Sequence, residues 1–490
     1  VVISKPVVSA DSSDIMPKLI GVVVKHTGYP EDFIEMDQDL EGELGIDTVK
    51  QAEEEFDLEI HGGWSRAEPQ KSFRIDFKSN YSGDIEVPLI PQKSFIQNYN
   101  NINLRNGGQH TWSDKIQDGL ISKVVHQTNV DNMAYQACVL YLNGKYWGVY
   151  GIREKIDEHY VENNYGISSD SVDLMNSWGV LAGNNTHALE TYDLIMNSNV
   201  NSPTFYDLAD SRFDFKNYID YFIIQTYIQN MDWIGIAWGA NNIKLWRPQT
   251  QNGKWRYVLY DTDGALGYFG QNVNENYLNY ARNPQVINNH SEMFDKMLQN
   301  DQFKCEFTKR YADLINTIFQ PDQFSSIAYL IKDEMYNAIP DHVLRWANSG
   351  TTTISSITQW SNDIDDILFY NSNRISTARN HLNQELGLQG QNNVTLDVFP
   401  PQSGSINIST ITPLTYPWSG IYFDGCPIGI SAIADSGFTF SHWDYNSLIG
   451  TQTNEKNLYL NINQNIEFVA NFIACNELIS VSINEENNTL

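Results

Sequence analysis

Alternating apolar and polar residues open the central part of the chain and predict its first strands. Apolar side chains stand at every second position in 56–60 and again in 73–77, which is the pattern of strands with one buried face. The stretch 62–71 between them, GGWSRAEPQK, is polar and contains two glycines and a proline. We therefore expect two antiparallel strands joined by a long loop.

A second strand pair is predicted further on by a tighter turn. The apolar run 139–142 is followed by Asn143-Gly144 and then by the largely apolar stretch 147–152. Asn-Gly is favoured in two-residue hairpin turns, because both turn positions need a positive φ. The sequence predicts a β-hairpin here.

Helical spacing dominates the rest of the central region. Apolar residues recur at intervals of three and four in 114–125 and 214–231, as in helices that bury one face. A strand is predicted at 255–260, and the chain beyond it to about residue 388 again has helical spacing. We expect an α+β domain over 56–388.

The first 55 residues have a different pattern, that of short helices in an acidic segment. Apolar residues in 15–23 predict one helix, and Asp47 is placed to cap a second. The stretch TGYPEDFIEMDQDLEGELGIDTVKQAE resembles acyl carrier domains of polyketide and polyunsaturated-fatty-acid synthases, over about 10–54. That family attaches phosphopantetheine to a Ser where this sequence has Thr48, so we expect a truncated carrier-like fragment without a prosthetic group. An unrelated acidic amphipathic helix is the alternative.

Short strands and turn residues fill the C-terminal part, from 392 to 474. The sequence GSINISTITPLTYPWSGIYFDGCPIGISAIADSGFTFSHWD resembles the small all-β repeat of bacterial surface proteins, a spacer or adhesion element in which Trp443 fills the core. The tail resembles the start of a C-terminal sorting domain of gliding bacteria. The predicted organisation is a helical segment at 1–55, the α+β domain at 56–388, a small all-β domain at 389–475 and a tail at 476–490.

The chain is strongly acidic, and this changes which partners we expect. Its 490 residues contain 60 Asp and Glu against 31 Lys and Arg, a formal charge of −29. Residues 1–60 carry −11 of this charge, and residues 61–390 carry −10. No basic stripe offsets it, so we exclude a nucleic-acid partner and expect divalent cations or basic proteins. No run of about 18 apolar residues occurs, so we expect no membrane span.

The four cysteines are far apart, at Cys138, Cys305, Cys426 and Cys475. None has a second Cys or a His at zinc-binding spacing, so the sequence predicts neither a metal cluster nor a dense disulfide framework. Sparse cysteines are compatible with a protein outside the cytoplasm. Their spacing does not decide a disulfide pairing.

The candidate chemistry lies in two acidic segments. Asp232 follows the predicted helix 214–231, Asp261 ends the predicted strand, and Asn242 stands between them. Phosphoryl transfer needs a carboxylate that accepts the proton of the attacking hydroxyl, and Asn and Asp oxygens that hold Mg²⁺ on the nucleotide. Asp232 with Asn242 ten residues later, and Asp261 with Asp263 after a strand, have the order found in kinases. A simple turn or a calcium loop is the alternative for the segment after the strand.

Five motifs in sequence order carry a family resemblance. They are IHGGWSRAEPQKSFRIDF, INLRNGGQHTWSDKIQDGL, YLNGKYWGVYGIREKID, QNMDWIGIAWGANNIKLWRP and KWRYVLYDTDGALG. Together they resemble the CotH family of atypical, spore-coat-type protein kinases, over about 56–388. The resemblance implies a reduced protein-kinase-like fold that uses ATP and a divalent cation such as Mg²⁺ to phosphorylate protein Ser or Thr. It implies that Asp232 is the catalytic residue and that Asp261 is the principal metal ligand. Asn242 and Asp263 are the further metal-binding candidates.

The residues that contact the nucleotide phosphates are predicted on the strand pairs. Lys71, which enters the second strand, is the first candidate, with Glu154 as the carboxylate that orients it. Arg66 and Arg105 are alternatives, because a guanidinium grips phosphate with two hydrogen bonds. The alternative interpretation is that Lys71 and Glu154 are ordinary solvent-exposed charges at the ends of hairpins.

Two functions follow from these observations. The first is an ATP- and Mg²⁺-dependent Ser/Thr kinase acting on a protein outside the cytoplasm, with a basic substrate favoured by the acidic surface. The second is a non-catalytic surface scaffold or adhesin with a pseudokinase-like domain. Both place the protein in the secreted or cell-surface fraction of a bacterium.

Overall fold

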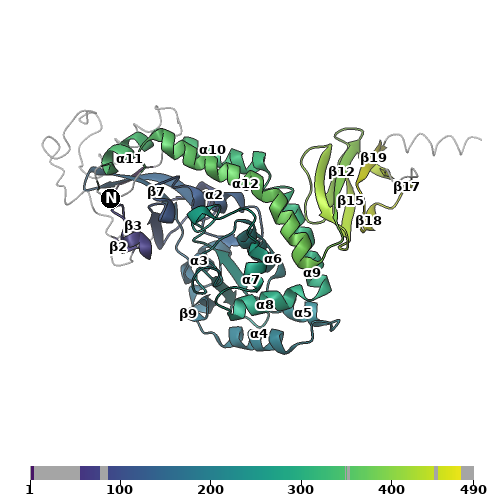
Figure 1. The fold of residues 1–490 in the computed structure, drawn as a ribbon, viewed down its shortest axis with the longest axis horizontal. Helices are drawn as coiled ribbons and strands as arrows, with labels where there is room; N and C mark the ends of the chain where they lie inside the picture. Colours follow the sequence, from purple (N-terminus) through teal and green to yellow (C-terminus); the bar gives the residue numbers. More distant parts are fainter. Residues whose placement is uncertain are drawn as a thin grey trace, which may run out of the picture. The chain divides into compact units, whose positions relative to one another are not determined.

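The structure is a computed structural model that describes residues 2–4, 56–77, 86–347, 349, 354–445 and 451–475 (Figure 1). Two compact units share the chain. The first takes Val1–Lys123, Met133–Val172 and Ser326–Asp366, and the second takes Val124–Asn132, Asp173–Ser325 and Ile367–Leu490. The carrier-like segment predicted at 10–54 and the tail at 476–490 lie outside the described residues. Among the helices that are described, none is long and apolar enough to cross a membrane.

The first unit is built on a six-stranded antiparallel sheet in the order β1-β6-β7-β4-β3-β2. Its strands are β1 (Val2–Ser4), β2 (Asp57–His61), β3 (Ser72–Asp76), β4 (Asn101–Arg105), β6 (Tyr135–Leu142) and β7 (Lys145–Arg153). Both predicted strand pairs are confirmed: Leu58 lies opposite Ile75, and β6 and β7 form a hairpin. The turn residues Asn143 and Gly144 have φ values of 50° and 71°, the conformation that Asn-Gly favours.

The helices that lie between or after these strands in the chain include α2 (Gln117–Val124), α3 (Glu158–Tyr165) and α11 (Ile339–Trp346). α11 lies against β7, where the backbone N–H of Val149 donates to His342 Nδ1 at 3.2 Å and Trp346 Nε1 donates to the carbonyl of Trp147 at 3.0 Å. The helix predicted at 114–125 begins only at residue 117. Lys115 has a φ of 61°, which a right-handed helix excludes, and Asp114 Oδ1 accepts the N–H groups of Ile116 and Gln117 at 2.9 Å.

The second unit contains a five-stranded sheet in the order β5-β11-β10-β8-β9. Its strands are β5 (Asp131–Asn132), β8 (Val172–Asn176), β9 (Gly179–Ala182), β10 (Lys244–Pro248) and β11 (Arg256–Leu259). β11 pairs in parallel with β5 and antiparallel with β10. The strand predicted at 255–260 is therefore confirmed, and it ends two residues before Asp261.

Helix α6 (Phe215–Tyr227) is the core helix of the second unit. Every residue of α6 except Lys216 is buried. The helix lies on β11, where the Asn217 side chain donates to the carbonyl of Tyr257 at 2.9 Å and accepts its N–H at 2.7 Å. The prediction extended this helix to residue 231, but it ends at 227 because Gln229 has a φ of 57°, which a right-handed helix excludes.

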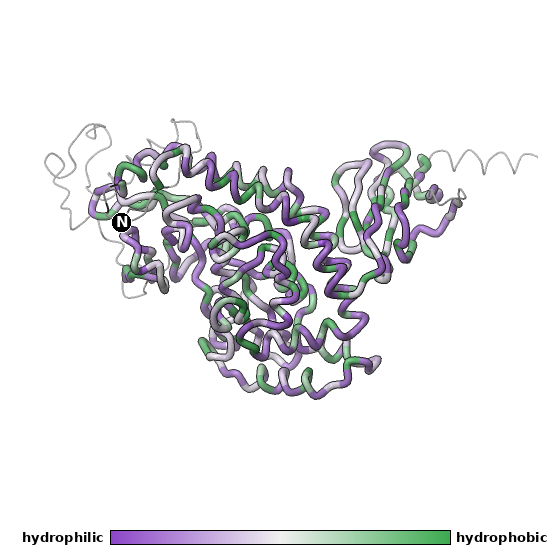
Figure 2. Tube along the Cα trace, viewed as in Figure 1, coloured by the Kyte–Doolittle hydropathy of each residue, from purple (hydrophilic) through white to green (hydrophobic). Residues whose placement is uncertain are grey.

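Further helices complete this unit: α4 (Thr186–Asn197), α5 (Phe205–Asp210), α7 (Tyr277–Arg282), α8 (Asn289–Leu298) and α9 (Asp301–Ile315). Two helices carry residues of both units, α10 (Pro321–Tyr336) and α12 (Ile357–Leu386). Hydrophilic and hydrophobic residues are interspersed along α12 (Figure 2). Its buried residues recur every three or four positions, so the predicted amphipathic spacing is confirmed.

The described residues from 391 to 474 of the second unit form strands joined by turns, as predicted from 392 to 474. They form two sheets, β14-β12-β19-β16-β17 and β13-β15-β18. The strands are β12 (Gln391–Phe399), β13 (Gly404–Ile408), β14 (Trp418–Phe423), β15 (Ile428–Ala434), β16 (Phe438–Tyr445), β17 (Thr451–Thr453), β18 (Asn457–Leu460) and β19 (Ile466–Ala474). Trp443 is fully buried and its ring meets Phe440 and Phe468, so its predicted core position is confirmed.

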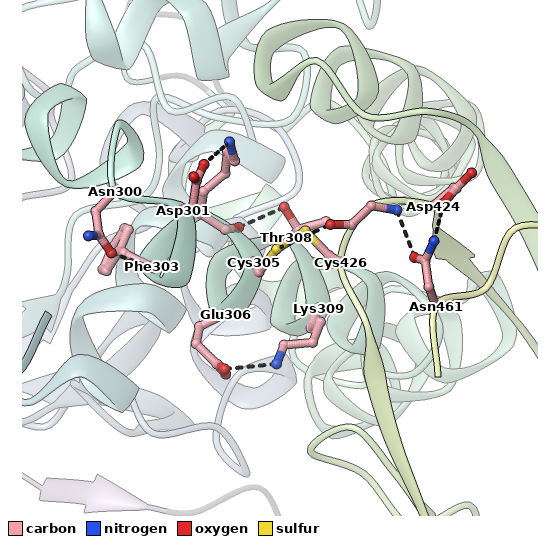
Figure 3. Close-up of a disulfide and its surroundings, with 12 residues drawn as sticks. Asn300, Asp301, Phe303, Cys305, Glu306, Thr308, Lys309, Asp424, Cys426 and Asn461 are labelled. Carbon is pink, nitrogen blue, oxygen red and sulfur yellow. Dashed lines mark hydrogen bonds and ion pairs between the residues drawn. A yellow bond between two sulfur atoms is a disulfide. The ribbon is translucent and has the colours of Figure 1, made fainter. Parts of the chain in front are cut away.

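A disulfide between Cys305 of α9 and Cys426, in the turn before β15, joins the helices to these sheets (Figure 3). Further along α9, the fully buried carboxylate of Asp313 accepts hydrogen bonds from the Thr410 hydroxyl and the Tyr422 hydroxyl, both at 2.7 Å. The β sheets are thus fastened to α9 by one covalent and several polar contacts.

Removing this disulfide is expected to destabilise the protein strongly. The bond closes a loop of 121 residues, and constraining a loop of this length in the unfolded chain is worth about 4–5 kcal/mol in the chain-entropy account. The Cys305→Ser/Cys426→Ser variant should therefore unfold at a clearly lower urea concentration. The control is Cys475→Ser, which removes an exposed cysteine outside the bond. Equal urea midpoints for the two variants would contradict the expectation.

Candidate active site

Two backbone hydrogen bonds bring the predicted acidic segments together. Past the end of α6, the N–H of Met231 donates to the carbonyl of Gly264 at 2.9 Å, and the N–H of Leu266 donates to the carbonyl of Ile228 at 2.9 Å. The chain after α6 and the chain after β11 are therefore held side by side. Asp232 lies on the first of these segments and Asp261 on the second.

Gly264 is required for this close approach. A Cβ atom at this position would lie 3.3 Å from the Cβ of Asp232, 3.4 Å from its backbone nitrogen and 3.1 Å from Asn230 Oδ1. A larger residue would push the two segments apart. The glycine in the Asp-Thr-Asp-Gly motif thus has a packing role.

Amide side chains hold the Asp232 carboxylate in place. Asn241 Nδ2 donates to its Oδ1 at 3.0 Å, and Asn242 Nδ2 donates to its Oδ2 at 3.1 Å. Asn242 also donates to the backbone carbonyl of Asp232 at 2.9 Å, while Asn230 Oδ1 accepts the N–H of Asp232 at 3.2 Å. Both oxygens of the carboxylate are therefore oriented.

The electrostatics of this region are those of crowded carboxylates. Burial raises the pKa of Asp232, the charge of Asp261 adds to this, and the hydrogen bonds from Asn241 and Asn242 act in the opposite direction. Burial also raises the pKa of Tyr268 to about 12, with contributions from the charges of Asp263 and Asp232. The three predicted carboxylates thus act on one small region, where like charges raise each other's energy.

Such a region suits a divalent cation that arrives with a phosphate ligand. Within the described part of the chain, no group of three or more His, Cys, Asp and Glu side chains is arranged to hold a metal. The predicted ligands Asp261, Asp263 and Asn242 offer only oxygen for coordination, the donor that Mg²⁺ prefers. Mg²⁺ is commonly bound by one or two carboxylates, water and substrate phosphates rather than by a cage of protein groups. The donor set fits that mode.

In the first unit, the structure changes the predicted ion pair. Glu154 pairs with Lys93 at 2.7 Å, and both side chains are buried. Lys71 instead donates to the backbone carbonyl of Arg66 at 2.6 Å. The predicted Lys71–Glu154 pair is therefore wrong. Glu154 also accepts hydrogen bonds from the Ala134 backbone and from the Asn164 side chain, each at 2.8 Å, so both of its oxygens are occupied.

Lys93 was missed by the sequence analysis, although a signal for it exists. The pentapeptide PQKSF occurs twice, at 69–73 and at 91–95. The first copy leads into β3, while in the second the same Pro-Gln-Lys forms the short helix η4 (Pro91–Lys93) and points its lysine at Glu154. The two copies are identical in sequence, so only the fold shows which lysine pairs with Glu154.

The other predicted cations also have defined surroundings. Arg105 lies 3.6 Å from the carboxylate of Asp118, which also pairs with the buried Arg153. Arg66 ends the short helix η3 (Trp64–Arg66), where its backbone N–H donates to the carbonyl of Gly63 at 3.2 Å. The roles proposed for these arginines and for Lys71 toward phosphate stay predictions.

A buried polar network joins three of the sequence motifs in the first unit. Gln70 Nε2 donates to the carbonyl of Val149 at 2.9 Å, Asn106 Nδ2 donates to the carbonyl of Gln70 at 2.7 Å, and Lys115 Nζ donates to Gln70 Oε1 at 2.9 Å. Burial lowers the pKa of Lys115 to about 7, and the nearby Asp114 and Glu68 partly offset this. The spacing of charged residues gave no signal for this network, because its central residues are amides.

Aromatic residues around Asp232 divide between core and surface. Trp233 and Trp246 are buried, whereas Trp238 is 45% exposed. Trp233 donates its indole N–H to the hydroxyl of Tyr221 in α6 at 2.9 Å. Trp233 thus ties the segment that carries Asp232 to α6.

Comparison with known families identifies a match. Residues 58–377, about two thirds of the chain, match the family model described as CotH kinase protein. The match includes both acidic segments and the strand pairs of the first unit. No curated protein matches the chain.

Proposed function

Because this chain belongs to the CotH kinase protein family, we propose that it transfers the γ-phosphoryl group of ATP to a Ser or Thr hydroxyl of a protein. The observation that carries the proposal is the placement of Asp232. Its carboxylate is oriented by Asn241 and Asn242 and lies beside the segment of Asp261. This arrangement supports a role for Asp232 as a base next to the proposed metal ligands.

The proposed reaction uses Asp232 as the proton acceptor. The substrate hydroxyl gives its proton to the carboxylate, its oxygen forms a bond to the γ-phosphorus, and the bond from that phosphorus to the β,γ-bridging oxygen breaks, so that ADP leaves. The raised pKa of Asp232 makes the carboxylate a stronger base than an exposed Asp. When bound, Mg²⁺ neutralises phosphate charge, and Asp261, Asp263 and the amide oxygen of Asn242 would hold it.

We further propose that the protein acts outside the cytoplasm on a basic protein. The Cys305–Cys426 disulfide supports the location, since structural disulfides persist in oxidising compartments. The formal charge of −29 supports the substrate, because opposite charge steers the encounter of two proteins.

The test is transfer of radiolabelled phosphate from ATP to a basic carrier protein in the presence of Mg²⁺, together with thermal unfolding. A ligand that binds only the folded protein raises the melting temperature, so saturating ATP and Mg²⁺ should stabilise the protein. Stabilisation without transfer would point to a nucleotide-binding scaffold. The absence of both stabilisation and transfer would contradict the proposal and would favour the non-catalytic surface protein.

A substitution at Gly264 should reduce the rate without replacing any charged residue. In Gly264→Ala the new methyl group meets Asp232 and Asn230 at 3.1–3.4 Å, so Asp232 has to shift. We expect kcat to fall about tenfold, because small displacements of a catalytic group are costly. The control is Gly429→Ala, where a Cβ meets nothing within 4 Å. A full rate for Gly264→Ala would show that the close approach does not matter.

A further inference from the structure

A polar pocket lies in the second unit, away from Asp232. It has a volume of about 510 Å³, within the usual range of ligand sites. Its lining includes His187 of α4, Arg212 just before α6, and Lys254 just before β11. The carboxylates of Asp207 and Asp210 complete one side of it.

Both ring nitrogens of His187 lie next to hydrogen-bond donors, and the Thr191 hydroxyl also lies 3.4 Å from Nδ1. Trp255 Nε1 lies 2.9 Å from Nδ1 of the ring, and an Arg212 guanidinium nitrogen lies 2.9 Å from Nε2. Indole and guanidinium groups can only donate. Burial, with smaller effects of Arg247 and Arg212, lowers the pKa of His187 to about 4, so the ring is neutral at pH 7 and accepts at one nitrogen. Either tautomer leaves one of these donors without an acceptor.

The charges in the pocket favour an anionic group with a cationic neighbour. Lys254 pairs with Asp210 at 2.9 Å. Arg212 forms no ion pair within the part of the chain that the structure describes, and its guanidinium contacts His187. The remaining carboxylate, Asp207, is exposed at the rim. An anionic group would therefore contact Arg212, and a positively charged group next to that anion would contact Asp207.

The pocket is tied directly to the elements that carry the candidate active site. The N–H of Trp255 donates to the carbonyl of Arg212 at 2.8 Å, and the N–H of Asp214 donates to the carbonyl of Trp255 at 3.0 Å. α6 starts at this point and leads to Asp232, while β11 starts here and leads to Asp261. Since α6 has 13 residues, the helix that lies between the two sites in the chain is about 20 Å long.

We propose that this pocket binds a phosphorylated Ser or Thr side chain of the protein substrate, with a Lys or Arg next to it in the substrate sequence. The proposal rests on the proposed kinase function, because that function would make such groups. A phosphate supplies several acceptors for the guanidinium of Arg212 and for the donor left over at His187. An extended chain covers about 20 Å with six residues, so a phosphorylated residue held here lets a second hydroxyl, six or more residues away, reach Asp232.

The test measures binding without ATP, so it does not depend on catalysis. A fluorescein-labelled peptide with phosphoserine between two lysines is titrated with the full chain, and fluorescence anisotropy is compared with that of the same peptide carrying Ser. We expect the phosphopeptide to bind at least tenfold more tightly, since a hydrogen bond to a charged group has about this effect. Equal binding of the two peptides would overturn the proposal whether or not the protein is a kinase.

Two substitutions and one control locate the binding. Arg212→Gln removes the guanidinium, and Gln251→Glu puts a negative charge on an exposed residue of the lining. Each should weaken phosphopeptide binding tenfold or more. Lys216→Gln removes an exposed charge outside the pocket and should leave binding unchanged. If Arg212→Gln fails to fold, Gln251→Glu decides, and unchanged binding in that variant would overturn the site.

Inorganic phosphate distinguishes a peptide site from a simple anion site. We expect it to compete with the phosphopeptide only at concentrations at least tenfold above the dissociation constant of the peptide, because it lacks the basic neighbours. Competition at equal concentration would overturn the assignment to a protein substrate.

Discussion

Asp232→Asn should reduce kcat for phosphoryl transfer by about 10²–10⁴-fold, the range that general acid–base catalysis contributes. The amide is nearly identical in shape to the carboxylate, but it cannot accept the proton of the substrate hydroxyl. One of its hydrogen bonds with Asn241 or Asn242 also turns into a contact between two donors. The measurement is the initial rate of radiolabelled phosphate transfer at saturating ATP and Mg²⁺.

A second variant separates the role of a base from that of a metal ligand. Asp232→Asn should keep the Mg²⁺-dependent stabilisation by ATP, whereas Asp261→Asn should lose most of it along with activity, because its carboxylate is the proposed metal ligand. The control Asp301→Asn changes a carboxylate that is 91% exposed and should behave like the wild type. A wild-type rate for Asp232→Asn would show that another group accepts the proton.

Asp220→Ala should lower the free energy of unfolding by about 3–5 kcal/mol, because it leaves a charge without its partner in a buried site. The carboxylate of Asp220 is fully buried in α6 and binds Arg310 with two hydrogen bonds, of 2.6 and 2.9 Å. It also accepts the backbone and side-chain N–H groups of Asn129 at 2.7 and 2.8 Å. All four bonds are lost at once in the variant.

The measurement is urea unfolding followed by tryptophan fluorescence. The same Asp301→Asn variant is the matched control, since its ion pair with Lys304 is exposed and contributes little. The double variant Asp220→Leu/Arg310→Met should be more stable than Asp220→Ala, because replacing both charges by apolar groups removes the unpaired guanidinium. An Asp220→Ala midpoint equal to that of the control would contradict a structural role for this pair.

The strand pairs show how far local pattern reaches. Alternation in 56–60 and 73–77, and the Asn143-Gly144 turn, predicted two pairs that the structure contains. These signals are reliable because each depends on neighbouring residues only. The strands depend on a period of two, and the turn depends on residues that adopt a positive φ. The mixed α+β composition is confirmed in the same way, while the kinase-like arrangement of the whole domain stays a prediction.

Helix ends were predicted less well than helix positions. The predicted helix at 114–125 starts at residue 117 and the predicted helix at 214–231 stops at 227. Apolar spacing continues past these ends, so it does not mark them. The ends were set by the backbone of Lys115 with the side chain of Asp114, and by the backbone of Gln229, local features that hydrophobic periodicity does not contain.

The sequence by itself determined the order of the motifs, the strand pairs and the chemical type of the candidate site, because these depend on residue identity and short spacing. Only the tertiary structure decided that Glu154 pairs with Lys93 and not with Lys71. It also decided that Gly264 seats the Asp261 segment against Asp232, and that Arg212 faces His187. The physical reason is the same in each case: partners far apart in the chain are chosen by the backbone path and by burial, and one-dimensional spacing carries neither.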